Sequence, residues 1–327
     1  MKSYTIADAH CDTISGLYRE VSLYKNGGHL DICRMQKYKN WLQFFACWVD
    51  SSLSVGEQAN LCDTIIDNYH SEIHKNAQHI AHTTNIGEIH SAWNDGKIAA
   101  LLTLEGGGSI GSDIANIQRL YDKGVRLITL TWNHNNDIAS GAGDKNPAYG
   151  LTAFGRQAVD EMNRLGIIVD VSHLSERGFW DLAEHTSGAD RLPAHRIFVA
   201  SHSNARAVCG HVRNLTDEQF LHMKSIGGVA GMNLCPLFVS TDCNSYGKKP
   251  DIDGIIAHIE HFIALGGEDN IGLGCDFDGI DYALSDLQGA EHMYRLLDRL
   301  ATLGYSDAQI EKIAYKNFLR VVETVCG

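Results

Sequence analysis

Short, almost continuously apolar runs recur along the chain, each followed by polar or glycine residues and then by a longer segment of helical pattern. Strands of a parallel sheet that helices cover on both faces have this nearly continuous apolar character. The pattern predicts eight strands: Tyr4–Ala9, Trp41–Val49, Ile98–Leu104, Val125–Thr131, Ile167–Val171, Ile197–Ser201, Gly228–Leu234 and Ile271–Cys275.

Helices are expected between these runs. Apolar residues of Ala153–Leu165 recur with the 3.6-residue period of a helix, and capping boxes are expected at Thr216–Gln219 and Ser306–Gln309. Eight alternating strands and helices predict an α/β fold, a (β/α)8 TIM-type barrel with residues 1–327 as a single domain. A doubly wound open sheet is the alternative, weakened because no Gly-x-Gly-x-x-Gly follows the first strand.

Composition and charge narrow the possible partners. The net charge of −13 and the lack of a basic cluster argue against nucleic acid. No apolar run approaches the ~18–20 residues of a membrane span, and the N-terminus has no signal-peptide pattern. Nine cysteines without a Cys-x-x-Cys pair are typical of reduced thiols. These features predict a cytoplasmic protein that binds neither nucleic acid nor membrane.

Histidines and carboxylates follow several of the predicted strands. In a barrel, the functional side chains gather at the C-terminal ends of the strands, so residues distant in sequence meet there. The segments concerned are His10–Asp12, Glu105–Gly107, Asp170–His173, Ser201–Ser203 and Asp276–Gly279. Side chains two positions apart on a strand point the same way, so His10 and Asp12 can reach one ion. Imidazole and carboxylate ligands suit zinc and its first-row neighbours.

Each of these residues, and Arg213 as a further candidate, could instead have an ordinary structural role. Glu105 could begin a turn, Asp276 could cap a helix, and Arg213 could be a surface cation. Their joint placement at strand ends favours a metal-dependent site.

The chain resembles the membrane (renal) dipeptidase family of zinc peptidases, within the amidohydrolase-like barrels. The matching stretches run in family order over nearly the whole chain: Asp8–Asp12, Leu104–Gly107, Gly124–Thr131, Asp170–His173, Ser201–Arg206, Arg213–Glu218 and Gly274–Gly279.

The resemblance implies a site with two Zn²⁺ ions per chain. By this resemblance, His10 and Asp12 bind one ion, His173 and His202 bind the other, and Glu105 bridges both. Arg213 matches the family's arginine for the substrate carboxylate, and Asp276 matches its catalytic acid/base. A homodimer is also implied.

One position departs from the family pattern. The family's substrate-binding histidine, as in the vertebrate enzymes, directly follows the stretch that ends at Thr131, where this chain has Trp132. His134 lies two residues later with the same strand parity, and we assign the substrate-binding role to it.

The resemblance implies hydrolysis of free dipeptides by a metal-bridged hydroxide, with a D-residue tolerated at the C-terminal position. Two alternatives stay open. One is a metal-dependent amidohydrolase acting on N-acyl amino acids or cyclic amides, in which a modified lysine often bridges the metals. The other is a binding barrel that has lost its chemistry.

Overall fold

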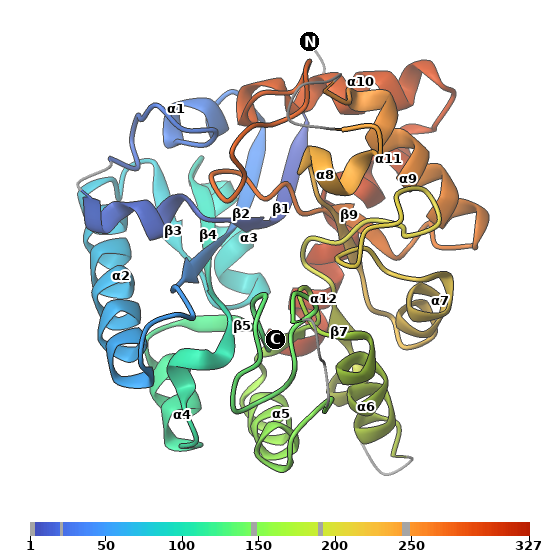
Figure 1. The fold of residues 1–327 in the computed structure, drawn as a ribbon. Coiled ribbons are helices and arrows are strands. Elements are labelled where there is room, and N and C mark those ends of the chain that lie inside the picture. Colours follow the sequence, from blue (N-terminus) through green and yellow to red (C-terminus); the bar gives the residue numbers. More distant parts are fainter. Residues whose placement is uncertain (1–3, 20–21, 145–148, 189–191, 244–248) are drawn as a thin grey trace.

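Parallel strands close into a barrel in the computed structural model, which describes residues 4–19, 22–144, 149–188, 192–243 and 249–327 (Figure 1). The strand order is β7-β6-β5-β4-β2-β1-β9-β8, and a parallel bridge between Ala200 and Ala230 joins its two ends. This bridge excludes the open sheet. The strands are β1 (Thr5–Cys11), β2 (Asn40–Trp48), β4 (Ile98–Glu105), β5 (Val125–Thr129), β6 (Ile168–Asp170), β7 (Phe198–Val199), β8 (Ala230–Met232) and β9 (Ile271–Leu273).

All eight predicted strands are present, so the predicted (β/α)8 TIM-type barrel is confirmed. A further strand, β3 (Ile80–His82), was not predicted. It pairs with Ile98–Ala100 at the start of β4, whereas β5 pairs with Leu102–Glu105 further along the same strand. β3 is short and only partly apolar, which is why the hydrophobic pattern does not reveal it.

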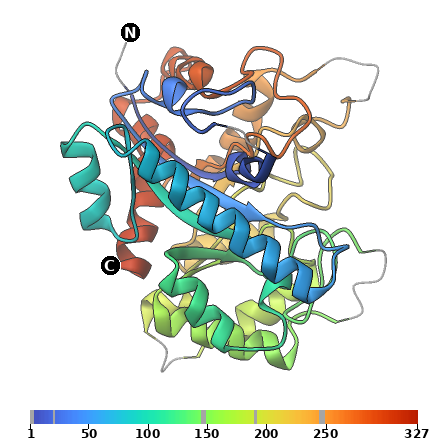
Figure 2. The same cartoon turned by 90° about the vertical axis from the view of Figure 1, so that its left-hand side faces the viewer.

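Helices surround the strands on the outside (Figure 1), and α2 lies along the barrel wall in the side view (Figure 2). Helix α5 coincides with the predicted Ala153–Leu165, and both predicted capping boxes form, before α7 and α11. The helices are α1 (Ile32–Met35), α2 (Val55–Lys75), α3 (Ile86–Asn94), α4 (Ala115–Asp122), α5, α6 (Glu176–Thr186), α7 (Asp217–Ser225), α8 (Pro236–Val239), α9 (Ile252–Ala264), α10 (Met293–Thr302), α11 (Asp307–Glu311) and α12 (Asn317–Cys326). In the described residues, no helix is both long and apolar enough to cross a membrane.

Two hydrophobic layers hold the barrel together. The larger lies between strands and helices and includes Ile6, Phe45 and Leu102. The smaller fills the barrel interior, where Ala7, Phe44 and Leu101 meet the C-terminal helix α12. Alternate residues of one strand thus belong to different layers, which explains the nearly continuous apolar runs. With one end of the barrel filled by this packing, the polar strand ends gather at the other.

Glycines let three neighbouring strand ends approach each other closely. A Cβ atom added at Gly231 on β8, or at Gly274 just after β9, would overlap the carbonyl oxygen of Ser201. The backbone there is hydrogen-bonded across the gap, with Ser203 donating to the carbonyl of Gly231 at 2.8 Å.

We therefore expect Gly231→Ala to lower the free energy of unfolding by about 1–3 kcal/mol, because the new methyl group forces a backbone shift. Gly56 in α2 is the matched control, since a Cβ there meets nothing within 4 Å. Gly56→Ala should be neutral or stabilising by about 0.5–1 kcal/mol. Urea unfolding of both variants measures the difference; equal stabilities would contradict the steric account.

Candidate active site

The predicted metal ligands converge at the C-terminal ends of the strands. In β1, the pairing with β2 advances by three residues, from Asp8 to Cys11, while β2 advances by two. A bulge of this kind redirects the side chains that follow it. His10 and Asp12 approach each other beyond the irregular register, with 3.3 Å between His10 Nε2 and Asp12 Oδ2.

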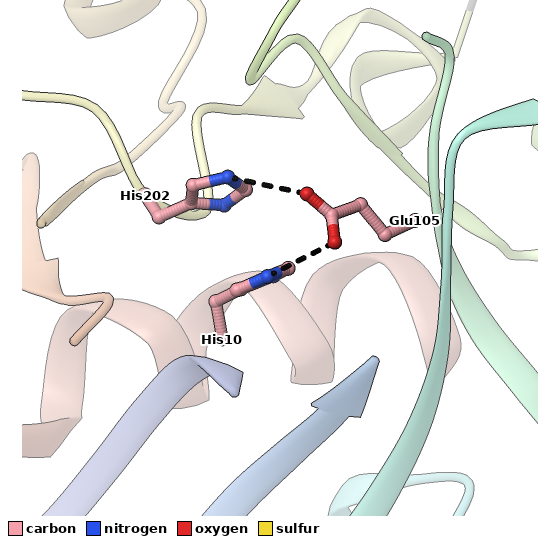
Figure 3. A group of neighbouring side chains, drawn as sticks. All are labelled: His10, Glu105 and His202. Atoms are coloured by element: carbon pink, nitrogen blue, oxygen red, sulfur yellow. Dashed lines mark ion pairs between the residues drawn. The ribbon is translucent and has the colours of Figure 1, made fainter. Parts of the chain in front are cut away.

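Glu105, the last residue of β4, lies at the centre of the cluster. Its Oε2 is 3.5 Å from Nε2 of His10, while its Oε1 is 3.1 Å from Nε2 of His173. Oε1 also lies 3.6 Å from Nε2 of His202. Figure 3 shows how the carboxylate faces His10 with one oxygen and His202 with the other. This divided contact is what a bridging carboxylate requires.

The hydrogen bonds of His173 and His202 fix which ring nitrogens carry a proton. Nδ1 of His173 lies 2.8 Å from the amide oxygen of Asn133, which can only accept. Nδ1 of His202 lies 2.7 Å from Oγ of Ser201, whose own proton is donated to Asp170. Both rings therefore carry their proton on Nδ1 and present a lone pair at Nε2.

Three lone-pair atoms consequently face one another without a proton between them. The Nε2 atoms of His173 and His202 are only 3.0 Å apart, and both approach Oε1 of Glu105. Such a group repels itself unless a cation lies among its members. In addition, neither ring nitrogen of buried His10 has a hydrogen-bond partner in the described part of the chain.

Burial and neighbouring charges shift the pKa values of His173, His202 and Glu105. Burial, reinforced by Arg213, lowers the pKa of His173 to about 4, and burial together with His10 and Arg213 lowers that of His202 well below its usual value. Both imidazoles are therefore neutral near pH 7. Burial opposes ionisation of Glu105, but His10 and His173 hold its pKa well below the usual range.

Burial and neighbouring charges also shift the pKa values of Asp12 and His10. Burial and the charge of Glu105 raise the pKa of Asp12 to about 8. Burial opposes protonation of His10, but Glu105 and Asp12 outweigh it and raise its pKa well above the usual range. Protons on His10 and Asp12 thus supply part of the positive charge that these closely spaced donor atoms need.

The donor set fits a divalent metal. Two groups have ligand atoms close enough to share one ion: His10, Glu105 and His202, and His10, Asp12 and Asp276. Imidazole nitrogen and carboxylate oxygen are ligands of zinc and its first-row neighbours. Metal ligation also requires deprotonated donors, which the neutral His173 and His202 supply.

Two buried aspartates outside the cluster hold its strands in place. Asp8 on β1 accepts a hydrogen bond from the backbone of Cys275 at 2.8 Å and one from the side chain of Gln43 at 3.1 Å. Asp170 on β6 accepts from the hydroxyls of Thr129 and Ser201, both at 2.6 Å. Each carboxylate therefore ties three neighbouring strand ends, and burial raises the pKa of Asp8 to about 6.

Asp276 lies at the edge of the cluster, just after β9. Its Oδ1 is 3.8 Å from Nε2 of His10, and its Oδ2 accepts a hydrogen bond from Asn233 at 2.9 Å. Its backbone is left-handed, with φ 62°, as is that of His173 with φ 66°. Such conformations are uncommon for residues other than glycine and cluster at functional sites. Burial raises the pKa of Asp276, with His10 opposing and Glu105 reinforcing the shift.

Arg213 is buried in the segment between β7 and α7. Its Nη1 lies 3.5 Å from Oγ of Ser203, and its guanidinium lies over the ring of Phe238 at 5.5 Å. In the described residues, Nε and Nη2 have no hydrogen-bond partner. A buried guanidinium with unused donors is suited to bind an anion.

His134 does not lie in the cluster. Its side chain is 59% exposed, and its Nδ1 lies 3.2 Å from Oδ1 of Asp144. Trp132 lines the cavity instead, with its ring 6.2 Å from that of His173. Parity along a strand does not apply here, because β5 ends at Thr129 and His134 lies beyond it.

A cavity of about 490 Å³ opens above the cluster, within the range of small-molecule sites. Its wall combines carboxylates with aromatic rings. The lining includes Asp12, Glu105, His173, Asp276, Trp48, Trp132 and Phe238.

The polar residues that hydrogen-bond to His173 and Asp276 were not predicted from the sequence. Asn133 binds His173, and Asn233 binds Asp276. Asn233 gave a signal that could have been used, because it is a polar residue within the apolar run Gly228–Leu234. Asn133 stands among several other asparagines, so nothing in the sequence singles it out.

Comparisons with known proteins show the family to which this fold belongs. The family model described as "Membrane dipeptidase (Peptidase family M19)" matches residues 1–326. An uncharacterized protein from the pqqA 5′ region of Klebsiella pneumoniae is 35% identical over 245 residues, covering 73% of this chain and 86% of that protein. An uncharacterized dipeptidase of Schizosaccharomyces pombe is 29% identical over 314 residues, covering 91% of this chain and 73% of its own.

Solved structures share the whole fold. A crystal structure of "dipeptidase AC", a metallopeptidase of family M19, superposes with a TM-score of 0.89 at 26% identity and 100% coverage of both chains. A metallopeptidase from Rhodobacter sphaeroides, solved with a phosphinate mimic of the dipeptide L-Ala-D-Ala, has the same fold, with a TM-score of 0.87, 24% identity and coverage of 99% of this chain and 100% of its own. Taken with the match over residues 1–326, these findings mean that the chain belongs to the membrane dipeptidase family of metallopeptidases, peptidase family M19.

Proposed function

We propose that this protein hydrolyses the single peptide bond of free dipeptides. The observation that carries the proposal is Arg213, a buried guanidinium whose Nε and Nη2 have no hydrogen-bond partner in the described residues and which lines a small pocket together with His173 of the cluster. A terminal carboxylate fills that need, because it can accept two parallel hydrogen bonds from a guanidinium. The carboxylates of the cluster favour a free α-amino group at the other end of the substrate.

The proposed cofactors are two divalent ions, with zinc as the expected metal. His10 and Asp12 would hold one, His173 and His202 the other, and Glu105 both, in keeping with the two oxygens that this residue turns towards different imidazoles. Divalent ions at such a site lower the pKa of a bound water and polarise a carbonyl oxygen.

Asp276 is proposed to move the proton during the reaction. Its Oδ2 is engaged by Asn233, which leaves Oδ1 towards the cluster. From there it takes a proton from the attacking water and donates one to the leaving amine nitrogen. Because its backbone is held in a left-handed conformation, the carboxyl group is oriented before substrate arrives.

Fixing both charged ends limits the substrate to two residues. His134 has no part in this scheme, since it lies on the exposed surface beside Asp144. Tolerance for a D-residue at the C-terminal position is proposed as well, supported by the L-Ala-D-Ala mimic bound to the R. sphaeroides enzyme of the same fold.

The direct test measures amino acid release from a panel of substrates by the zinc-reconstituted protein. We expect hydrolysis of L-Ala-L-Ala and L-Ala-D-Ala, and none of a tripeptide, an N-acetylated dipeptide or a dipeptide amide. Cleavage of the acetylated substrate alone would favour the amidohydrolase alternative, and no cleavage of any would refute the proposed function.

Arg213→Lys serves as the matched variant in the same assay. It keeps the positive charge but loses the paired geometry, so KM for dipeptides should rise at least about tenfold while bound metal is unchanged. An unchanged KM would remove Arg213 from the substrate site.

Asp276→Asn separates proton transfer from metal binding. Asparagine tolerates the left-handed backbone and preserves the size of the side chain, so folding should be maintained. We expect kcat to fall about 10²–10⁴-fold with metal content unchanged. Metal analysis and steady-state kinetics on the same preparation check this. Loss of metal would make Asp276 a ligand instead, and retained activity would assign proton transfer to another residue.

A further inference from the structure

Two tryptophans form part of the cavity wall next to Glu105. Trp48 ends β2, where it is the direct register partner of Glu105 on β4. Trp132 follows β5 on the other side of β4, and the two indole rings meet edge to face, with centroids 5.2 Å apart. The pair Trp48 and Trp132, both half-buried and both lining the cavity, is called the aromatic wall below.

Glycine at position 106 makes room for this arrangement. Gly106 has a φ of 87°, which side-chain-bearing residues rarely adopt, and a Cβ there would lie 3.3 Å from Cβ of Trp132. The backbone after Glu105 is thus shaped so that Trp132 can lie against it. The ring then faces Trp48 on one side and His173, at 6.2 Å, on the other.

Strand order places Trp48, the outer member of the aromatic wall, across the barrel from Arg213, while Trp132 lies between Trp48 and His173. Arg213 lies in the segment after β7, and β2 is separated from β7 by three strands in either direction around the barrel. Phe238, the ring beneath the guanidinium, belongs to the Arg213 side of the cavity. The cavity is therefore lined by an aromatic ring on the Arg213 side, Phe238, and by another on the β2 side, Trp48.

We propose that the aromatic wall receives the side chain of the substrate's N-terminal residue, so that the enzyme prefers dipeptides beginning with a large apolar residue such as leucine or phenylalanine. The inference rests on the proposed function. A dipeptide whose carboxylate binds Arg213, and whose peptide bond lies over the cluster, directs its first residue towards β2. The amino group then faces the carboxylates of Asp12 and Asp276, while the side chain meets the rings.

The chemistry of the wall favours apolar side chains over charged ones. Indole rings offer large contact surfaces that gain from covering aliphatic or aromatic groups. An acidic side chain would instead be placed near Asp12 and Glu105, both of which line the same cavity. Apolar size at the first position is therefore the property that this end of the cavity selects.

The test compares kcat/KM for two substrate pairs that differ at one position each. Leu-Ala against Gly-Ala reports on the N-terminal position, and Ala-Leu against Ala-Gly on the C-terminal one. For the unaltered enzyme we expect the first ratio to be at least about tenfold. In Trp132→Ala and Trp48→Ala this ratio should fall towards unity, whereas the second ratio should change less than about threefold. Ratios within one preparation do not depend on the fraction of folded protein.

Two further variants serve as controls. Trp132→Phe retains a ring and should retain most of the preference. Trp180→Ala removes a tryptophan on α6, outside the cavity, and should leave both ratios unchanged. Hydrolysis of all four dipeptides without preference at the first position, a greater preference for Asp-Ala or Lys-Ala, or equal effects on both ratios would overturn the aromatic-wall proposal and leave the dipeptidase function standing. Absence of hydrolysis of every dipeptide would refute the function itself.

Discussion

The buried carboxylates of Asp8 and Asp170 are the constraint on which the site depends. Neither belongs to the ligand cluster, yet each accepts hydrogen bonds from two strand ends besides its own. A buried carboxylate is costly unless its oxygens are fully hydrogen-bonded, so each one holds its neighbours at fixed distances. Asp8 thereby fixes β9 relative to β1, and Asp170 fixes the loop of His202 relative to β6. The ligands of both proposed metal ions are positioned in this way.

Fixed positions bring like groups together. The Nε2 atoms of His173 and His202 lie 3.1 and 3.6 Å from Oε1 of Glu105 and 3.0 Å from each other, with their protons held on the far side of each ring. A chain optimised for stability alone would not collect lone pairs in this manner, and local conflicts of this kind mark functional sites. Arg213 adds a second conflict, a buried cation whose Nε and Nη2 lack hydrogen-bond partners in the described residues. Cation and anion binding at the two places would relieve both.

Much of this architecture follows from the sequence, because the dominant forces are periodic. Eight apolar runs gave the barrel strands, and the chain segments beyond them contain the residues that meet at one rim. Predictions that depend on local backbone geometry are harder. Residue composition does not reveal the left-handed backbone of His173 and Asp276 or the register shift in β1. The substrate role assigned to His134 relied on strand parity, but β5 ends at Thr129 and the side chain lies 59% exposed beside Asp144.

The hydrophobic pattern also could not predict the residues that orient or surround the candidate site. Asn133 orients His173 from a loop whose path is set by tertiary contacts. Trp48 lies in the cavity wall because it pairs with Glu105 on the adjacent strand. Pairing across strands is a property of register, which a single sequence does not specify. The histidines and carboxylates that the structure brings together were therefore recognisable from the sequence, whereas the residues that shape the space around them were not.

The donors that converge at the strand ends are proposed to form a centre for two cations. The most direct measurement is metal stoichiometry after zinc loading and exhaustive dialysis, made on the unaltered protein and on His10→Asn and His202→Asn, which remove a donor from each proposed ion. The unaltered protein should retain two ions per chain, and either variant should retain one or fewer. Retention of no metal by the unaltered protein, or of two ions by both variants, would contradict it.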